Sequence, residues 1–334
     1  MMKKIKYQQL FYRLVLLILG FNFQNSFAQQ VPLIDQYYIN PTFYNPANVG
    51  YKGLFNSYLL RNQKFKDFDG GQVTHLFTAD LSLFNNQQGV GFNLTSDDVG
   101  LFSNTQLLAS YSYRVQLNKV SSIRFGLSAG LSDFRVNSNE IHADPNDTYL
   151  TNSEIKNTEF MANLGAFYTY NDLFVSLTVP QLLNNSIKDK EGNKETTYKL
   201  VRHMLLGAGY KINLEKYNAE RFKNITITPS VLLRYAKSTP VQYDINVLAE
   251  MKDKVWFAVS YRDEFSIGLN VGIHFLEKFS FGYSYDIGIK KVGQYASNNH
   301  EFMLAYKIKT RKSSVEQNKI NSEISTFYCF NFIC

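Results

Sequence analysis

The sequence predicts an all-β fold, a transmembrane antiparallel β-barrel of about 14 strands that follows a turn-rich N-terminal segment. The first supporting observation is the pattern in residues 264–290, where apolar or aromatic side chains alternate with Gly, Ser, Asn or charged ones. Side chains alternate faces along a strand, so both runs in this stretch have one apolar and one polar face. Each run is about 10 to 13 residues long, close to the length of a tilted strand that crosses a bilayer.

The second observation is that this alternation recurs along the chain, and the third is the composition. A soluble β-sandwich can show such alternation once or twice, and it is the weaker alternative for so many repeats. Aromatic residues make up 15% of the chain, yet the mean hydropathy is −0.24. A helical membrane bundle is excluded by that value, whereas a barrel stays close to it because only one face of each strand is apolar.

Charge and cysteine usage exclude several function classes. The net charge of +7 includes Lys3, Lys4, Lys6 and Arg13, and without them 31 basic residues face 28 acidic ones. This small, dispersed excess does not indicate a nucleic-acid partner. Cys329 and Cys334 are the only cysteines, so a disulfide framework and a catalytic thiol are not expected in the folded domain.

Residues 1–28 are predicted to be a signal peptide. A positively charged region through Arg13 precedes an apolar stretch at 14–21 and the small-x-small site Ser26-Phe27-Ala28. The apolar stretch is too short for a membrane-spanning helix. We therefore expect cleavage near Ala28 and export, with the outer membrane of a Gram-negative bacterium as the destination.

Residues 29–52 differ from the rest because Asn40-Pro41 and Asn45-Pro46 mark consecutive turns. From the residues alone, a loop that caps the barrel is favoured over a plug or docking segment. Four aromatic residues would be exposed together in a free loop, which is unusual. These are Tyr37, Tyr38, Phe43 and Tyr44.

Residues 53–309 are predicted to form the barrel. The expected strands are 54–61, 73–83, 90–94 (ending at 97–100), 105–115, 123–131, 160–170, 173–179, 204–212, 225–235, 241–251, 255–261, 265–275, 279–289 and 302–308. An even number of strands means that the first strand begins and the last strand ends on the periplasmic side. The long polar segments 137–157 and 184–197 are expected as loops on the outer face, and 310–334 as a polar C-terminal tail.

Catalytic and metal-binding patterns are weak. The five histidines are scattered singly. Asp144, Asn146 and Asp147 lack the spacing of a calcium-binding EF-hand loop, and His274 with Ser266 or Ser284 is a poor candidate for a lipase-like site. We expect neither an enzyme nor a cofactor. Charged residues on inward faces are expected to pair across the lumen: Asp80, Asp244, Glu250, Asp286, Arg114, Arg124 and Arg234.

The turn-rich segment resembles the N-terminal signature of the PorP/SprF family, outer-membrane proteins of the type IX secretion system and the gliding machinery. The matching residues, which we take as candidates for partner docking, are Gln36, Tyr37, Asn40, Pro41, Tyr44, Asn45, Pro46, Ala47 and Gly50. Similar pieces follow at 61–63, 89–92, 97–100, 113–114, 125–131, 179–183, 261–262, 281–286 and 300–301. The resemblance runs from about residue 31 to 309. It departs at Lys64-Phe65, where the family often has Trp-Pro, and in the tail after Thr310.

The resemblance implies a non-catalytic role in export or surface anchoring of a secreted protein, often a large adhesin, that carries a type IX C-terminal signal domain. It also implies contacts with membrane lipids, with other secretion-system components and, for some members, with a periplasmic lipoprotein that binds peptidoglycan. It favours the docking or plug interpretation of residues 29–52. The alternative is a passive outer-membrane channel or transporter for small hydrophobic solutes, a class with a similar strand pattern.

Overall fold

The computed structural model describes residues 32–52, 54–66, 69–136, 155–183, 186–191, 194–199, 202–217, 224–237, 239–251, 254–289 and 299–308. The predicted signal peptide, the tail with Cys329 and Cys334, and the calcium candidates Asp144, Asn146 and Asp147 lie outside these residues. Among the described residues, no helix is both long enough and apolar enough to cross a membrane.

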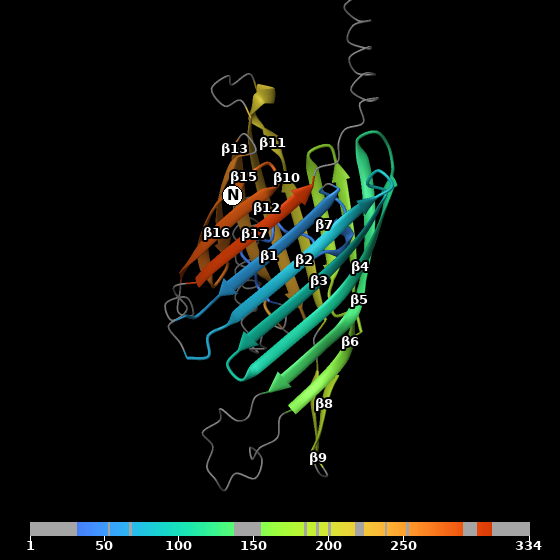
Figure 1. Cartoon of the computed structure of the whole chain (residues 1–334), viewed down its shortest axis with the longest axis vertical. Helices are drawn as coiled ribbons and strands as arrows, with labels where there is room; N and C mark the ends of the chain where they lie inside the picture. Colours follow the sequence, from blue (N-terminus) through green and yellow to red (C-terminus); the bar gives the residue numbers. More distant parts are fainter. Residues whose placement is uncertain are drawn as a thin grey trace, which may run out of the picture.

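The described chain forms a closed antiparallel β-barrel of 14 strands (Figure 1), as predicted. The strands are β1 (Phe55–Gln63), β2 (Val73–Leu83), β3 (Gln88–Val99), β4 (Phe102–Gln116), β5 (Ser121–Val136), β6 (Ile155–Tyr170), β7 (Leu173–Val179), β10 (His203–Tyr210), β12 (Ile225–Ala236), β13 (Gln242–Met251), β14 (Val255–Arg262), β15 (Ser266–Phe275), β16 (Phe279–Gly288) and β17 (Asn299–Ile308). Pairing of β1 with β17 and of β10 with β12 closes the sheet. Closure leaves no edge strand exposed to lipid.

Five short elements are not among the 14 barrel strands. They are the 3-10 helix η1 (Pro46–Asn48), the hairpin of β8 (Ser186–Glu191) and β9 (Lys194–Lys199), the two-residue strand β11 (Ile212–Asn213) beside β12, and the 3-10 helix η3 (Leu214–Tyr217). The β8–β9 hairpin corrects the expectation of an irregular loop at 184–197. Its sequence has a Gly-Asn pair between two polar strands, a hairpin signal that the absence of an apolar face obscured.

The two ends of the barrel differ in their connections. Because β1 begins and β17 ends at the same end, the connections 84–87, 117–120 and 171–172 also lie there, and all three are short. β5 ends and β6 begins at the opposite end, the lower one in Figure 1, where the β8–β9 hairpin also lies. We call these the short-turn end and the long-loop end. The asymmetry is incomplete, since β11 and η3 lengthen a connection at the short-turn end and the connections 100–101 and 263–265 at the long-loop end are short.

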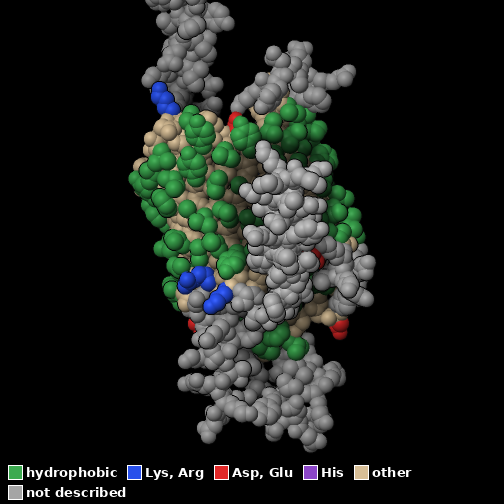
Figure 2. Space-filling view, turned by 180° about the vertical axis from the view of Figure 1, so that it is seen from behind, with side chains coloured by type: hydrophobic (Ala, Val, Ile, Leu, Met, Phe, Trp, Pro, Cys, Tyr) green, Lys and Arg blue, Asp and Glu red, His purple; other side chains and the backbone are tan. Residues whose placement is uncertain are grey.

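The outer face is apolar and the inner face follows the predicted parity. In β15, Ile267, Leu269 and Val271 are exposed while Ser266 and Asn270 are buried. Apolar side chains cover much of the outer surface (Figure 2). The prediction of a polar inner face was incomplete, because several inward-facing side chains are large, apolar and buried. They include Leu60, Leu76, Leu248, Trp256 and Met303.

A charge on the lipid face should impair barrel assembly. We expect Leu269→Arg to cost about 2–4 kcal/mol, because Leu269 is 48% exposed in the middle of β15. The readout is the amount of folded, heat-modifiable protein in outer membranes. Ser110→Arg is the matched control, since Ser110 faces the lumen and is only half-buried. If both variants assemble equally well, the assignment of the lipid face is wrong.

Candidate functional site

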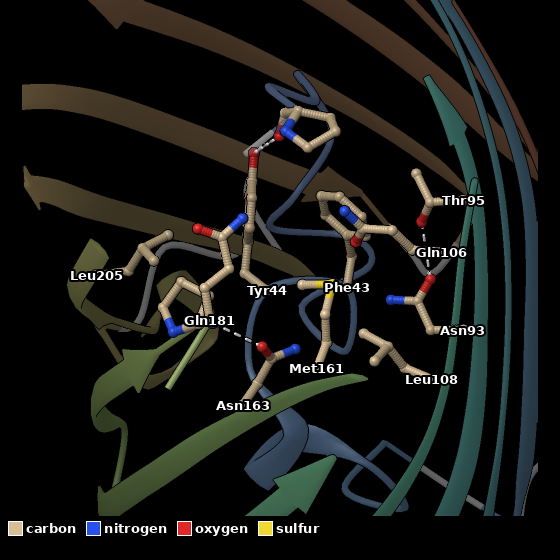
Figure 3. Close-up of a pocket in the computed structure, with 12 residues that line it drawn as sticks. Phe43, Tyr44, Asn93, Thr95, Gln106, Leu108, Met161, Asn163, Gln181 and Leu205 are labelled. Carbon is tan, nitrogen blue, oxygen red and sulfur yellow. Dashed lines mark hydrogen bonds between the residues drawn. The ribbon is translucent and has the colours of Figure 1, made fainter. Parts of the chain in front are cut away.

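Residues 32–52 of the N-terminal segment lie inside the barrel lumen and occupy its middle. Backbone pairing does not explain its position, because no residue of the segment joins the barrel ladder. Contacts with side chains of the barrel wall hold it instead. The segment enters at the long-loop end, where Asp35 contacts Asn62 and Glu301. It leaves at the short-turn end, where Leu54 precedes β1. The blue ribbon in Figure 3 follows part of this course.

The two Asn-Pro steps give the segment its turns. Asn45 adopts the extended conformation (φ −125°, ψ 111°) that a residue before proline requires, and its side chain accepts a hydrogen bond from the Ala47 amide at 2.8 Å. Pro46 then starts η1 with a fixed φ and no unpaired amide hydrogen. The first step is also a turn, since the Asn45 amide donates to the Pro41 carbonyl at 3.1 Å. The turns predicted from sequence are confirmed.

A buried charge cluster holds the start of the segment. The backbone amides of Asp35 and Gln36 each donate to one carboxylate oxygen of Glu301 at 2.8 Å. The Asp35 carboxylate accepts from Arg262 at 3.0 Å and lies 3.7 Å from the Lys64 ammonium. All these side chains are 8% exposed or less. Buried charges persist only when they are paired in this way.

The cluster continues into the barrel wall through Arg262. Its guanidinium also donates to Asp244 at 3.3 Å, and Arg234 donates to the same carboxylate at 2.6 Å and 3.0 Å. Burial raises the pKa of Asp35, but the charges of Lys64 and Arg262 together with side-chain hydrogen bonds lower that pKa below its ordinary value, so the carboxylate remains ionised. Asp35 and Asp244 therefore each have a cation within 4 Å.

Aromatic side chains fill the middle of the segment. Tyr37 contacts Tyr38 and Tyr44 edge-on, with ring centroids 5.7 Å and 6.0 Å apart, and Phe43 packs on Tyr44 at 4.7 Å. This group packs against a buried cluster that includes Ile34 and the inward-facing Trp256. Burial raises the pKa of the Tyr37 and Tyr44 hydroxyls, which keeps both neutral. The exposed aromatic group that a free loop would present is thus absent from this structure.

The wall around η1 is shaped for close backbone approach. A Cβ added at Gly126 of β5 would lie 2.3 Å from the Ala47 nitrogen and from the Pro46 carbonyl carbon, and one at Gly89 of β3 would lie 2.2 Å from the Val49 oxygen. Only glycine leaves room for these contacts. The Asn45 amide group donates to the Ala166 carbonyl at 3.0 Å. Glycine on the polar faces therefore serves the fit of the segment.

Two charged wall residues bind the end of the segment. The Asp80 carboxylate accepts from the Gly50 amide at 2.9 Å. The Val49 carbonyl accepts from Arg124 at 3.4 Å and from the Ser112 hydroxyl at 2.7 Å. The end of the segment is thus anchored by side chains from β2, β4 and β5, whereas its start is held by side chains from β1, β14 and β17.

The expectation that inward-facing charges pair across the lumen is wrong. Asp80 and Arg124 contact the segment, Asp244 pairs with Arg234 and Arg262 on neighbouring strands, and Arg114 bonds to Gln116 on its own strand. The segment occupies the space that such pairs would have to cross. His274 accordingly contacts Ser280 at 2.7 Å, beside the Trp256 ring, and not Ser266 or Ser284.

The nine docking candidates from sequence all lie in this segment. Six are buried against the wall, whereas Tyr37, Pro41 and Tyr44 are partly exposed. Among the described residues, no group of three or more histidine, cysteine or acidic side chains could hold a metal ion. Sequence reasoning missed the anchors Asp35, Lys64 and Glu301 as site residues. The signal was in the resemblance, because the pieces at 61–63, 261–262 and 300–301 supply Asn62, Arg262 and Glu301.

Comparison with known families decides the identity. The family model described as type IX secretion system membrane protein PorP/SprF matches residues 26–306. The chain belongs to the PorP/SprF family. A search of curated proteins gives no match. Three of the pieces that suggested PorP/SprF membership from sequence, those at 61–63, 261–262 and 300–301, meet around residues 35 and 36 in the folded protein.

Solved structures that resemble this PorP/SprF protein are outer-membrane barrels. The CymD monoaromatic hydrocarbon channel has a TM-score of 0.50 at 10% identity, covering 80% of this chain and 92% of CymD. The P. putida toluene transporter TodX has a TM-score of 0.46 at 7% identity, covering 80% of this chain and 93% of TodX. A Pseudomonas aeruginosa FadL homologue has a TM-score of 0.42 at 10% identity, covering 75% of this chain and 88% of the homologue. At these identities the likeness to CymD concerns the fold alone.

Proposed function

We propose that this PorP/SprF protein is a plugged, non-catalytic barrel that supports export or surface anchoring of a secreted protein with a type IX C-terminal signal domain, such as an adhesin. The observation that carries the proposal is that residues 32–52 are bound inside the barrel lumen. The segment is fixed at both ends and fills the middle of the lumen with aromatic side chains. A barrel filled in this way suits an assembly component better than an open pore. Its partners would be outer-membrane lipids, other secretion-system components and a periplasmic peptidoglycan-binding lipoprotein.

The second candidate function is a passive channel for small hydrophobic solutes. It is favoured by the fold shared with CymD and by a cleft beside the segment. The cleft volume is about 40 Å³, room for roughly three water molecules. Passage of a hydrocarbon would therefore require the segment to move. Single-channel conductance and solute uptake in the wild-type protein separate the two functions, since only the channel predicts either.

The proposed role makes the segment necessary for delivery of the secreted protein. We expect Asn45→Ala combined with Pro46→Ala to leave a heat-modifiable barrel but to reduce the surface amount of that protein. The double substitution removes the side-chain bonds to Ala166 and Ala47 and the fixed backbone of η1. Pro240→Ala is the control, because Pro240 is exposed and lies outside the segment. Normal delivery in the double variant would leave the segment with a structural role only.

The long-loop end is proposed to face the cell exterior, because external loops of such barrels are longer than periplasmic turns. We expect a cysteine at Asn193, between β8 and β9, to react with an impermeant maleimide on intact cells. A cysteine at Lys254, between β13 and β14, should react only after the outer membrane is opened. The reverse labelling pattern would invert the orientation.

A further inference from the structure

The outer face of β17, β1, β2 and β3 changes from apolar to polar between two neighbouring rows of side chains. These four strands lie side by side in the barrel wall (Figure 1). One row of directly paired residues is wholly apolar: Leu304, Leu59, Phe77 and Leu94. The next row toward the long-loop end is Phe302, Arg61, His75 and Ser96. The apolar surface of these strands therefore ends at Arg61 and His75.

The row that contains Arg61 lies near the level of the lipid headgroups. Arg61 is two residues from Gln63, where β1 ends at the long-loop end. An arginine that faces lipid is costly at the bilayer midplane and costs little near the membrane surface. Tyr283 of β16 pairs with Phe302 in the same row, and its hydroxyl lies 2.8 Å from the Nδ1 atom of His300. Tyrosine is typical of the membrane–water interface, which supports the same depth.

The polar groups of Arg61 and His75 are left for a group from the membrane. The two residues lie directly opposite each other on β1 and β2, and both side chains are exposed. Within the described part of the chain, neither side chain has a hydrogen bond or an ion pair. The one outward-facing acid of these four strands, Asp98, is one row farther toward the long-loop end and accepts from the Ser103 hydroxyl.

We propose that Arg61 and His75 bind a phosphate group of lipopolysaccharide in the outer leaflet. The planar guanidinium of Arg61 donates two parallel hydrogen bonds to the phosphate oxygens, and an imidazole N–H of His75 donates a third. The acyl chains of the same molecule lie along the apolar row, against Leu59 and Phe77. A lipid with a charged head and apolar chains thus matches both rows at once.

An acidic group of a partner protein is the competing occupant. Such a group could reach Arg61 from the aqueous side, but it would leave the adjoining apolar row to other molecules. Leu59 in that row is 55% exposed, as expected for a surface covered by acyl chains. Charge complementarity and the apolar row together therefore favour a phosphate-bearing lipid.

The choice of leaflet rests on the proposed orientation of the barrel, whereas the phosphate contact does not. Cysteine labelling at Asn193 tests the orientation, and lipid binding tests the site. Neither measurement involves delivery of a secreted protein. The lipid site, the orientation and the export function can therefore fail separately.

The test is native mass spectrometry of the full chain, purified in an uncharged detergent and titrated with diphosphoryl lipid A. We expect saturable binding. Dephosphorylated lipid A, which has the same acyl chains, should bind roughly 10- to 100-fold more weakly, because charge-assisted hydrogen bonds are lost. Inorganic phosphate at the same concentration should not displace lipid A, since it lacks the acyl chains.

Substitutions in the row assign this binding to Arg61 and His75. Arg61→Leu should lower the affinity for diphosphoryl lipid A by roughly 10- to 100-fold and remove most of the difference between the two forms of lipid A. Arg61→Lys keeps the charge but not the planar fork, so part of the affinity should remain. His75→Leu removes one neutral donor and should bind roughly 3- to 10-fold more weakly.

Arg135→Leu is the matched control for a general effect of charge. Arg135 is 48% exposed, but its guanidinium is already paired with Asp133. The affinity for diphosphoryl lipid A should therefore be unchanged in a variant that remains heat-modifiable. An equal loss in Arg135→Leu and Arg61→Leu would overturn the proposal. So would the absence of saturable binding, or equal binding of both forms of lipid A to the wild-type protein.

Discussion

Replacing Arg262 by leucine is expected to release the start of the N-terminal segment while the barrel stays folded. Arg262 contacts Asp35 at 3.0 Å, Asp244 at 3.3 Å and the Ile34 carbonyl at 3.3 Å, so its loss leaves buried anions with fewer cations. Removing one partner of a buried pair costs about 3–5 kcal/mol. The pairing of β14 with its neighbours uses backbone groups and does not depend on this side chain.

Hydrogen exchange of the Asp35 and Gln36 amides measures this release, because both amides donate to Glu301. A loss of about 3 kcal/mol corresponds to exchange that is roughly a hundredfold faster. Arg135→Leu is the control. The Arg135 guanidinium lies 2.6 Å from the Asp133 carboxylate, but Arg135 is 48% exposed. Loss of this ion pair should therefore cost less than about 1 kcal/mol. Unchanged exchange in Arg262→Leu would mean that other contacts seat the segment.

The strands could be predicted from sequence because the bilayer imposes a simple rule. Lipid-facing positions must be apolar, so Ile267, Leu269 and Val271 alternate with small or polar residues and give β15 a clear period of two. The boundaries were less certain where polar residues extend a strand beyond the membrane. β5 and β6, for example, pair as far as Val136 and Ile155, so that residues 155–157 of the expected loop belong to a strand.

The contacts that hold the segment inside the lumen could not be predicted in the same way. Parity places Arg262 and Glu301 inside the barrel, but it does not say which inward-facing residues meet. Glu301 and Asp35 are 266 residues apart, and their contact depends on closure of the whole sheet. Buried Leu76 and Trp256 also break the rule of a polar inner face, because a filled lumen packs like a protein core. Only the turns of the segment, set by Asn45 and Pro46, are local enough to read from sequence.

A methyl group added at Gly126 is expected to displace η1 from the barrel wall. The new Cβ of Gly126→Ala would lie 2.3 Å from backbone atoms of both Ala47 and Pro46, so η1 has to shift. Overpacking of this kind costs about 1–3 kcal/mol. Val49→Cys reports the shift, because Val49 is 3% exposed and cysteine is smaller than valine. The reporter should resist maleimide alone and react once Gly126→Ala is added.

Gly207→Ala in β10 is the matched control for this displacement. Gly207 is also a buried strand glycine, but a Cβ there would meet its nearest neighbour, the Ser176 Cβ, at an ordinary 3.5 Å. The Val49→Cys reporter should therefore remain unreactive in the Gly207→Ala background. Equal reactivity in both backgrounds would indicate that loosening of the barrel, and not the fit of η1 against Gly126, exposes the segment. Reaction only with Gly126→Ala would show that the absence of a side chain at this one wall position keeps η1 in place.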